Sequence, residues 1–260
     1  MVDPDGPGPA PEGWPPRLWE VLAADPSLTM VADGDAAYPA NLAGLHGRPP
    51  VLFVRGRLDP ADVASVAVIG TRQATPLGRD WARRAAADLA GAGWTVVSGL
   101  ARGIDAEAHR GAIDAGGRTL AVLGSGLDVV YPPEHAGLAA EVARAGATIS
   151  QWWPWAPPAP HRFRRRNALC AGLARATLVV EAGARSGARL QARLARGQGR
   201  PVLLAARLAA AEPWARDLVE ADAASVVAGA GDVVAMLGGL CPPGLAPLPA
   251  APVQLRLRLG

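Results

Sequence analysis

Between residues 65 and 205, short apolar runs alternate with longer, alanine-rich stretches. A run of apolar and β-branched residues with no alternation of polar positions is typical of a strand covered on both faces, and six such runs occur, at residues 66–69, 95–97, 119–123, 147–149, 178–180 and 201–204. The stretches between them repeat apolar residues at helical spacing, which predicts helices at residues 79–89, 104–115, 135–144, 163–173 and 189–196.

This alternation of strands and helices predicts an α/β fold, an extended Rossmann-like, doubly wound and mostly parallel sheet with a short N-terminal extension. After residue 207 the pattern weakens to two helices, at 214–220 and 232–237, around a short strand at 225–227. We expect a disordered tail at 1–13, a short amphipathic segment and linker at 14–50, the Rossmann-like domain at 51–240 and a Pro/Ala-rich tail at 241–260.

The chain contains no apolar run of about 18 residues, so we expect no membrane span. Residues 1–16 lack the basic stretch followed by an apolar one that marks a signal peptide. Cys170 and Cys241 stand apart, with no CxxC motif and no nearby histidine cluster. These features predict a cytoplasmic protein with neither disulfide nor metal site.

The net charge of +3 conceals a strong asymmetry along the chain. Residues 1–40 carry seven acidic side chains and one arginine, whereas residues 151–200 carry ten arginines and one acidic residue, Glu181. A basic stretch of this density indicates a polyanionic partner.

Small residues follow four of the predicted strands, at the ends where a doubly wound sheet binds its ligands. Glycine lets the backbone approach a ligand closely, and the helix N-terminus behind it presents N–H groups to an anion. The alternative is that glycine only permits tight turns. We favour phosphate binding, because four such turns share one edge and two carry an arginine. The candidate residues are Gly70, Thr71 and Arg72, then Ser98, Gly99, Arg102 and Gly103, then Gly124, Ser125 and Gly126, and finally Ser186 and Gly187.

None of these turns matches a nucleotide-hydrolysing or dinucleotide-binding motif. The chain has no lysine and hence no P-loop, and no GxGxxG sequence follows a predicted strand. Asp105 and His109 share a helical face, but we interpret Asp105 as satisfying backbone donors at the helix start. A Ser/His/Asp triad using Ser98 or Ser186 lacks the GxSxG elbow. We therefore expect no cofactor and no catalytic activity.

The segment from Trp152 to Asn167 combines aromatic and basic residues. Arginines bind phosphates without sequence preference, and aromatic faces stack on unpaired bases. We favour a nucleic-acid role for the arginines, because four of them within five positions repel one another unless an anion offsets them. For Trp152, Trp153 and Trp155 we favour a structural role, with the rings pinning a proline-rich loop onto the core. The candidate residues here are Phe163, Arg164, Arg165, Arg166 and Asn167.

Taken with their spacing, these motifs resemble those of the DprA/Smf DNA-processing family over residues 38 to about 237. The matching motifs are Tyr38-Pro39 with Leu42, Pro49-Pro50 before residues 51–56, residues 68–72 (VIGTR), residues 98–105 (SGLARGID) with Ala108-His109, residues 124–128 (GSGLD) with Tyr131-Pro132, Phe163 with Arg166-Asn167, and residues 180–182 (VEA) with Ser186-Gly187.

The resemblance implies a protein that binds single-stranded DNA, protects incoming DNA during natural transformation and helps to load the RecA recombinase. It also implies a homodimer without established catalytic activity. The residues that it places along the DNA groove are Arg72, the loop 98–103, Arg165, Arg166, Asn167, Ser186 and Gly187.

Several positions depart from the family pattern. Gln151 replaces the usual glutamate and Ala168 replaces an arginine, while Arg164, Arg189 and Arg193 offer compensating charge. The family's N-terminal helical domain is expected to be nearly absent and its C-terminal winged helix missing. Two alternatives stay open at this point, a nucleotide-sensing protein of the wider superfamily and a protein-interaction role for a diverged paralogue.

Overall fold

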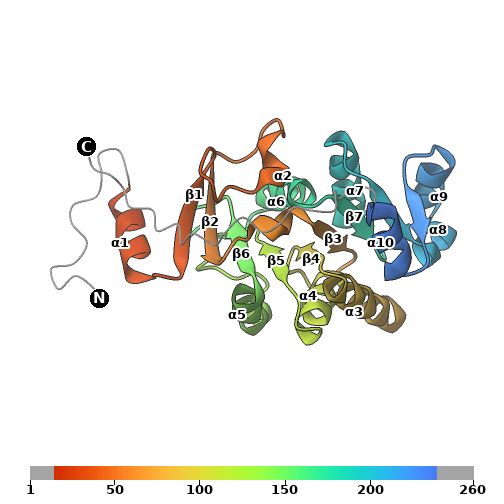
Figure 1. Ribbon diagram of the computed structural model, residues 1–260, viewed down its shortest axis with the longest axis horizontal. Coiled ribbons are helices and arrows are strands. Elements are labelled where there is room, and N and C mark those ends of the chain that lie inside the picture. Colours follow the sequence, from red (N-terminus) through yellow and green to blue (C-terminus); the bar gives the residue numbers. More distant parts are fainter. Residues whose placement is uncertain (1–14, 239–260) are drawn as a thin grey trace.

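A computed structural model describes residues 15–238. Within this range, nine strands form one mixed sheet in the order β1-β2-β6-β5-β4-β3-β7-β8-β9 (Figure 1). The strands are β1 (Leu28–Ala32), β2 (Val51–Gly56), β3 (Ser65–Ile69), β4 (Thr95–Ser98), β5 (Thr119–Val122), β6 (Ala147–Ser150), β7 (Ala176–Val179), β8 (Val202–Ala205) and β9 (Ser225–Val227). The α-helices are α1 (Pro16–Ala24), α2 (Ala40–Ala43), α3 (Pro76–Gly91), α4 (Ile104–Asp114), α5 (Ala136–Ala145), α6 (Pro160–Leu173), α7 (Gly187–Gly197), α8 (Ala206–Ala211), α9 (Pro213–Glu220) and α10 (Ala230–Gly238), and the 3₁₀ turns are η1 (Pro60–Val63) and η2 (Pro133–His135).

The doubly wound, mostly parallel sheet predicted from the sequence is confirmed. Every neighbouring pair from β6 to β9 is parallel, and the chain reverses its direction of winding between β3 and β7. Helices α3, α4 and α5 cover one face of the sheet, and α6 and α7 cover the other (Figure 1). Such a reversal leaves a crevice beyond the carboxyl ends of the strands.

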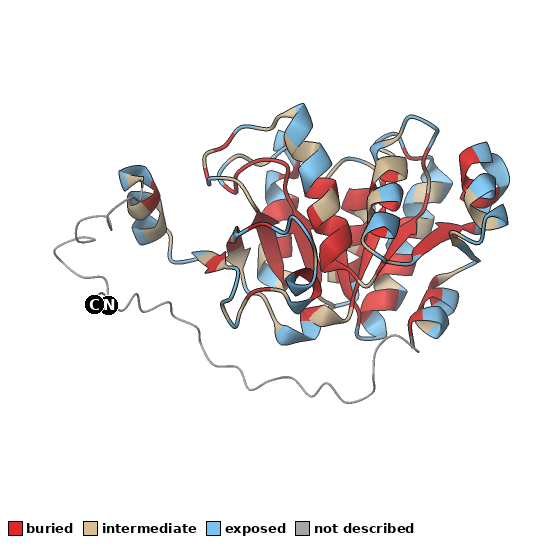
Figure 2. Ribbon diagram, turned by 90° about the horizontal axis from the view of Figure 1, so that it is seen from above, coloured by how far each residue is buried: buried red, intermediate tan, exposed pale blue. Residues whose placement is uncertain are grey.

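The central strand β3 shows why these runs have no alternation of polar positions. Its Val66 and Val68 join the apolar cluster on the side of α3 and α4, whereas Ala67 and Ile69 join the cluster formed with α6 and α7. Because successive side chains of a strand point to opposite faces, a strand covered on both sides has no polar face. The central strands are accordingly the most buried part of the molecule (Figure 2).

Within residues 15–50, predicted as a short amphipathic segment and linker, helix α1 is followed by strand β1, which adds five residues to the edge of the sheet. Strand β1 pairs antiparallel with β2, and β2 pairs antiparallel with β6. The connection between them is anchored, because Tyr38 donates a hydrogen bond to Pro49 O at 2.6 Å and Asn41 donates one to Leu173 O at 2.7 Å. Strand β1 was missed because its five residues, LTMVA, are too short to show a clear alternation. The predicted tails, 1–13 and 241–260, lie outside the described residues.

No helix between residues 15 and 238 is both long and apolar enough to cross a bilayer.

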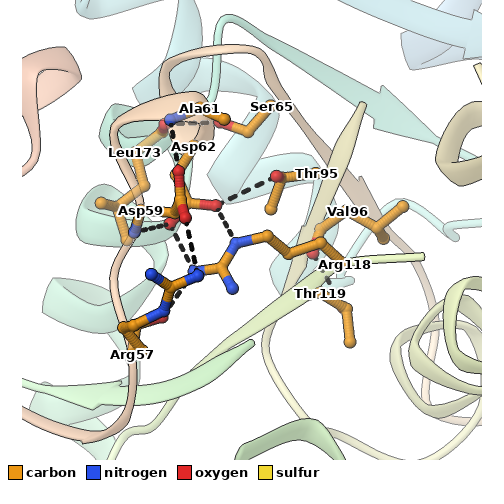
Figure 3. A network of polar contacts seen from close by, with 10 residues as sticks. All are labelled: Arg57, Asp59, Ala61, Asp62, Ser65, Thr95, Val96, Arg118, Thr119 and Leu173. Atoms are coloured by element: carbon orange, nitrogen blue, oxygen red, sulfur yellow. Dashed lines mark hydrogen bonds and ion pairs between the residues drawn. The ribbon is translucent and has the colours of Figure 1, made fainter. Parts of the chain in front are cut away.

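The amino ends of the central strands are tied together by an ion pair between Asp62 and Arg118. The Asp62 carboxylate accepts bonds from Arg118 Nε at 2.6 Å and Nη2 at 2.8 Å, and from the Thr95 hydroxyl at 3.0 Å. It also accepts from the backbone N–H of Asp59 at 2.8 Å, which closes a capping box on η1. Figure 3 shows Asp62 at the centre of this network. Its polar groups are satisfied internally, so this edge is built for stability.

Candidate nucleic-acid interface

The four small-residue turns predicted to bind phosphate lie side by side. They follow β5, β4, β3 and β7, which are consecutive in the sheet and parallel, so all four leave the same carboxyl edge. The turns after β3 and β7 flank the point where the winding reverses. The edge therefore has the geometry of a ligand-binding crevice.

A recess in this edge brings together residues from three turns and helix α6. Five of its lining residues were predicted as individual site residues, and Ala101 lies in the loop 98–103 that the family resemblance places along the groove, whereas Tyr131 and Pro132 were not predicted to line it. The predicted residues that line it are Arg72, Gly99, Arg102, Phe163 and Arg166.

The innermost charge of the recess is the guanidinium of Arg166, which is only 5% exposed. Its Nη1 lies 3.8 Å from Asp105 Oδ2 and donates to Val122 O at 3.3 Å. Its Nε has no hydrogen-bond partner among the described residues. A buried guanidinium with an unused donor is costly on its own.

Gly99 leaves room for this guanidinium. A β-carbon at position 99 would lie 1.2 Å from Arg166 Nη1 and 2.8 Å from Asp105 Oδ2. Glycine at position 99 therefore leaves space for the Arg166 side chain, in addition to allowing the tight turn expected from the sequence.

Asp105 lies against the guanidinium of Arg166. Burial raises the pKa of its carboxyl group, while the Arg166 charge and backbone N–H groups of the adjoining turns oppose that rise. One of these donors is the N–H of Ala101, 3.4 Å from Asp105 Oδ2. The interpretation that Asp105 satisfies backbone donors at the start of α4 is confirmed, and its contact with Arg166 is a second role that the sequence did not reveal.

The turn between β4 and α4 has an unusual backbone. Leu100 is a buried, non-glycine residue with φ of 59°, a conformation that typically costs roughly 1–3 kcal/mol. Gly103 has φ of 76°, and a β-carbon there would lie 2.4 Å from Thr71 O. The two positions fix the path of the chain around Ala101 and Arg102, which line the recess.

Phe163 forms one wall, and two guanidinium groups lie near its ring. The Cζ atoms of Arg72 and Arg166 lie 5.5 and 5.9 Å from its ring centroid, within the range of cation–π contact. Tyr131 packs against the same ring at 5.7 Å between centroids, and 38% of Tyr131 is exposed. A β-carbon on Gly124 would lie 2.6 Å from Phe163, so Gly124 makes room for the ring. The wall thus combines two positive charges with two aromatic surfaces.

Arg102 lies at the mouth of the recess, in an ion pair with Glu134 of η2. Both side chains are about half exposed, at 55% and 47%. The carboxylate of Glu134 therefore occupies the place where a phosphate would meet Arg102. Its own pKa is lowered by its backbone N–H and by Arg102.

Arg164 and Arg165 are exposed on α6, and no ion pair to either is found within residues 15–238. Next along the helix, Asn167 is buried and donates to Gly187 O at 3.3 Å. The Ser186 hydroxyl accepts from the N–H of Ala188 at 3.2 Å and caps α7. These contacts tie the turn after β7 to α6, beside the recess.

Several predicted site residues form part of this edge but do not line the recess. Ser98 donates its hydroxyl to Val68 O at 2.7 Å and is fully buried, and Ser125 donates to Val129 O at 2.6 Å. Gly126 makes room for the backbone of Trp153 and Pro154. Gly70 packs against Ile104, and Thr71 donates its N–H to Glu181 O at 2.6 Å. The sequence could not tell whether these small side chains pointed inward or outward.

His109, which was considered for catalysis, and the acidic residue Glu181 are also engaged internally. His109 is fully buried, its Nδ1 lies 2.8 Å from Thr119 Oγ1, and burial lowers its pKa to about 3. The Glu181 carboxylate accepts from the N–H and hydroxyl of Thr75, each at 3.1 Å, at the start of α3. The arrangement suits binding of an anion better than proton transfer.

The tryptophan-rich loop follows β6 and divides into two parts. Trp152 is half-buried, with the Arg162 guanidinium 5.1 Å from its ring centroid and His161 packed edge-on. Trp155 is also half-buried, whereas Trp153 is 46% exposed. The structural role expected for the tryptophans therefore describes Trp152 and Trp155 better than Trp153.

Tyr131 and Glu134 are the site residues that the sequence reasoning missed. Tyr131-Pro132 had been noted only as a matching motif, and Glu134 carried no signal because exposed glutamates are common. Only the path of the chain from β5 into η2 brings both to the recess.

Sequence comparisons place the chain in a known family. Residues 29–238 match the sequence profile of a family described as DNA recombination-mediator protein A. Protein Smf of Synechocystis is 41% identical over 172 residues, 65% of this chain and 43% of that protein. Protein Smf of Escherichia coli is 40% identical over 178 residues, 68% of this chain and 48% of that protein. The chain thus spans about half the length of these curated relatives.

Comparison with solved structures finds relatives of the same family. DNA processing protein A of Streptococcus pneumoniae superposes with a TM-score of 0.73 at 32% identity, over 80% of this chain and 74% of that one. A structure of the Helicobacter pylori protein, which concerns its single-stranded DNA binding mode, also has a TM-score of 0.73, at 25% identity over 82% of this chain and 96% of that one.

Proposed function

Because this chain belongs to the DNA recombination-mediator protein A family, we propose that it binds single-stranded DNA along the carboxyl edge of its sheet. The observation that carries the proposal is the buried guanidinium of Arg166, held at the base of a recess with one donor unused. Phosphates are the anions that a row of arginines recognises without reading sequence.

The surroundings of Arg166 favour a single strand over a duplex. Phe163 and Tyr131 offer aromatic surfaces beside the two guanidinium groups of Arg72 and Arg166. Bases of an unpaired strand can stack on such surfaces, whereas bases inside a duplex already stack on each other. The Helicobacter pylori relative, whose structure concerns single-stranded DNA binding, supports the same choice.

The proposal is one of binding without catalysis. The groups that would serve as base or nucleophile, His109 and Ser98, are buried and hydrogen-bonded inside the protein. Asp105 is committed to Arg166 and to backbone donors.

The wider role follows from the family. We propose that the protein protects incoming DNA in natural transformation and assists the loading of RecA, acting as a homodimer. The family's description as a recombination mediator supports this. The test is assembly of RecA filaments on single-stranded DNA with and without the protein. Faster assembly supports the role, and unchanged assembly alongside intact DNA binding contradicts it.

The binding proposal is tested by fluorescence anisotropy of a labelled oligothymidylate at low salt, with unlabelled single strand, duplex and mononucleotides as competitors. The single strand is expected to compete far better than duplex of equal length. Failure of the chain to bind the oligothymidylate contradicts the proposal. Efficient competition by a mononucleotide would favour a nucleotide sensor instead.

A further inference from the structure

Trp153 is the exposed member of a stack of rings at the end of the sheet near β2. Its indole lies parallel to that of Trp155, with 6.0 Å between centroids and an interplanar angle of 7°. Phe53 of β2 packs against Trp153 at 5.7 Å, and the Arg17 guanidinium lies 4.5 Å from the Trp155 centroid. We call Trp153 and Trp155 the tryptophan platform.

The platform lies on the same edge of the sheet as the recess. Its loop leaves the carboxyl end of β6, where Ser150 pairs with Phe53. The turn 124–126 connects the two features: a β-carbon on Gly124 would lie 2.6 Å from Phe163, and one on Gly126 would lie 2.1 Å from Trp153 O. Two residues of chain span at most about 7 Å, so the backbone of the loop that carries the platform adjoins the recess.

Trp153 is far more exposed than the tryptophans that serve the core. Trp94 and Trp214 are 7% and 5% exposed, as expected for rings that serve the core, whereas Trp153 is 46% exposed. Among the exposed large apolar side chains of residues 15–238, the two aromatic ones are Trp153 and Tyr131, and both lie on this edge. An exposed indole beside a binding surface is a typical contact residue.

The charges around the platform indicate what covers it. Arg17 lies over Trp155, and Arg162 lies over Trp152 in the same loop, so the aromatic surface is bordered by positive charge. The recess shows the same combination of aromatic surfaces and arginine, at Phe163, Tyr131 and Arg72. Single-stranded nucleic acid presents the complement, a base to stack and a phosphate to pair.

We propose that Trp153 is a second base-stacking position, which receives an unpaired base from the same strand whose phosphates occupy the recess. This inference rests on the proposed function. It extends the path of the strand from the turns after β3 and β4, past Tyr131, to the loop after β6. Arg17 then lies where it can meet a phosphate of the extended strand.

The test is the affinity for oligothymidylates that increase by one nucleotide at a time, for the unaltered chain and for Trp153→Ala. We expect the two to bind the shortest oligomers equally, because these occupy only the recess. For longer oligomers the variant should bind about tenfold more weakly, the effect of losing one stacked base. The dependence on salt should not change, since no charge is removed.

Two variants separate stacking from a loss of structure. Trp153→Phe keeps an aromatic face and should restore most of the affinity for long oligomers. Met236→Ala removes another exposed apolar side chain, 44% exposed on α10, and should leave every affinity unchanged. Superimposable curves for Trp153→Ala and the unaltered chain at all lengths overturn the inference while the proposed function stands. Failure of the unaltered chain at every length overturns both.

Discussion

Arg166 Nη1 lies 3.8 Å from Asp105 Oδ2, and both side chains are buried beneath the carboxyl edge of the sheet. The carboxylate offsets a charge whose burial would otherwise be costly. It also fixes the guanidinium from one side, while Nε stays without a partner among the described residues. The pair thus holds the guanidinium of Arg166 in place, where it is expected to bind an anion.

Gly99→Ala should disturb this pair directly. Its β-carbon would lie 1.2 Å from Arg166 Nη1, so the guanidinium must move. We expect affinity for oligothymidylate to fall about tenfold, the loss of a hydrogen bond to a charged group. Anisotropy titrations measure the loss, and far-UV circular dichroism checks that the fold is retained.

Gly137→Ala is the matched control, because nothing lies within 4 Å of a β-carbon at that position of α5. It should leave affinity unchanged and raise the free energy of unfolding by about 0.5–1 kcal/mol. Equal effects of the two alanines on DNA binding would argue against a role for the Gly99 contact.

Glu134→Gln should strengthen DNA binding. The substitution removes the carboxylate that pairs with Arg102 and frees the guanidinium for phosphate. Because the ion pair is exposed, the gain should be modest, about threefold at low salt. The control is Glu141→Gln on α5, which changes the net charge equally at an exposed position. A similar gain in both variants would indicate a general effect of charge.

The stability of the protein should fall in acid because of His109. Burial lowers its pKa to about 3 from the ordinary 6.5, so the unfolded chain binds this proton more tightly than the folded one. The contribution of His109 is therefore fully present above pH 6.5 and is lost as pH falls toward 3. Within that window the free energy of unfolding should lose up to about 1.4 kcal/mol per pH unit.

Urea unfolding at several pH values measures this dependence, and His109→Gln should flatten it. The exposed His46, replaced by glutamine, serves as the control and should leave the slope as it is. An unchanged slope in His109→Gln would mean that other groups cause the loss in acid.

Asp62→Asn should lower stability without altering DNA binding. Asp62 accepts bonds from Arg118, Thr95 and Asp59 at the amino edge of the sheet, away from the recess (Figure 3). Breaking a buried ion pair typically costs about 3 kcal/mol, which urea unfolding can measure. A loss of affinity measured where the variant is fully folded would contradict the separation of the two edges.

The sequence predicts the parallel core of the sheet and the edge that is proposed to bind DNA. Runs such as 66–69 are apolar at every position because both faces are covered, and this pattern needs no tertiary information. The carboxyl ends of β3, β4, β5 and β7 meet at one edge by topology alone, so Gly99 and Arg166 could be placed on it in advance.

The direction in which each side chain points could not be predicted from the sequence. Ser98 and Ser125 follow strands as Thr71 does, yet their hydroxyls turn inward to backbone carbonyls. The partner of Arg166 could not be identified either, because Asp105 and Arg166 are distant along the chain. They meet only because α6 packs against β4, and Asp105 lies just beyond the end of that strand. Tyr131 and Glu134 could not be placed either, because only the path of the folded chain from β5 into η2 brings them to the recess.

The most direct test of the account is a salt titration of oligothymidylate binding for the unaltered chain, Arg72→Ala and Arg84→Ala. Both variants remove one exposed arginine, but Arg72 lines the recess and Arg84 lies on α3 paired with Asp80. Arg72→Ala should weaken binding and reduce the slope of log K against log salt by about 0.7, the effect of one lost phosphate contact, while Arg84→Ala changes neither. Salt-independent binding, or equal losses in the two variants, would contradict DNA recognition at this edge.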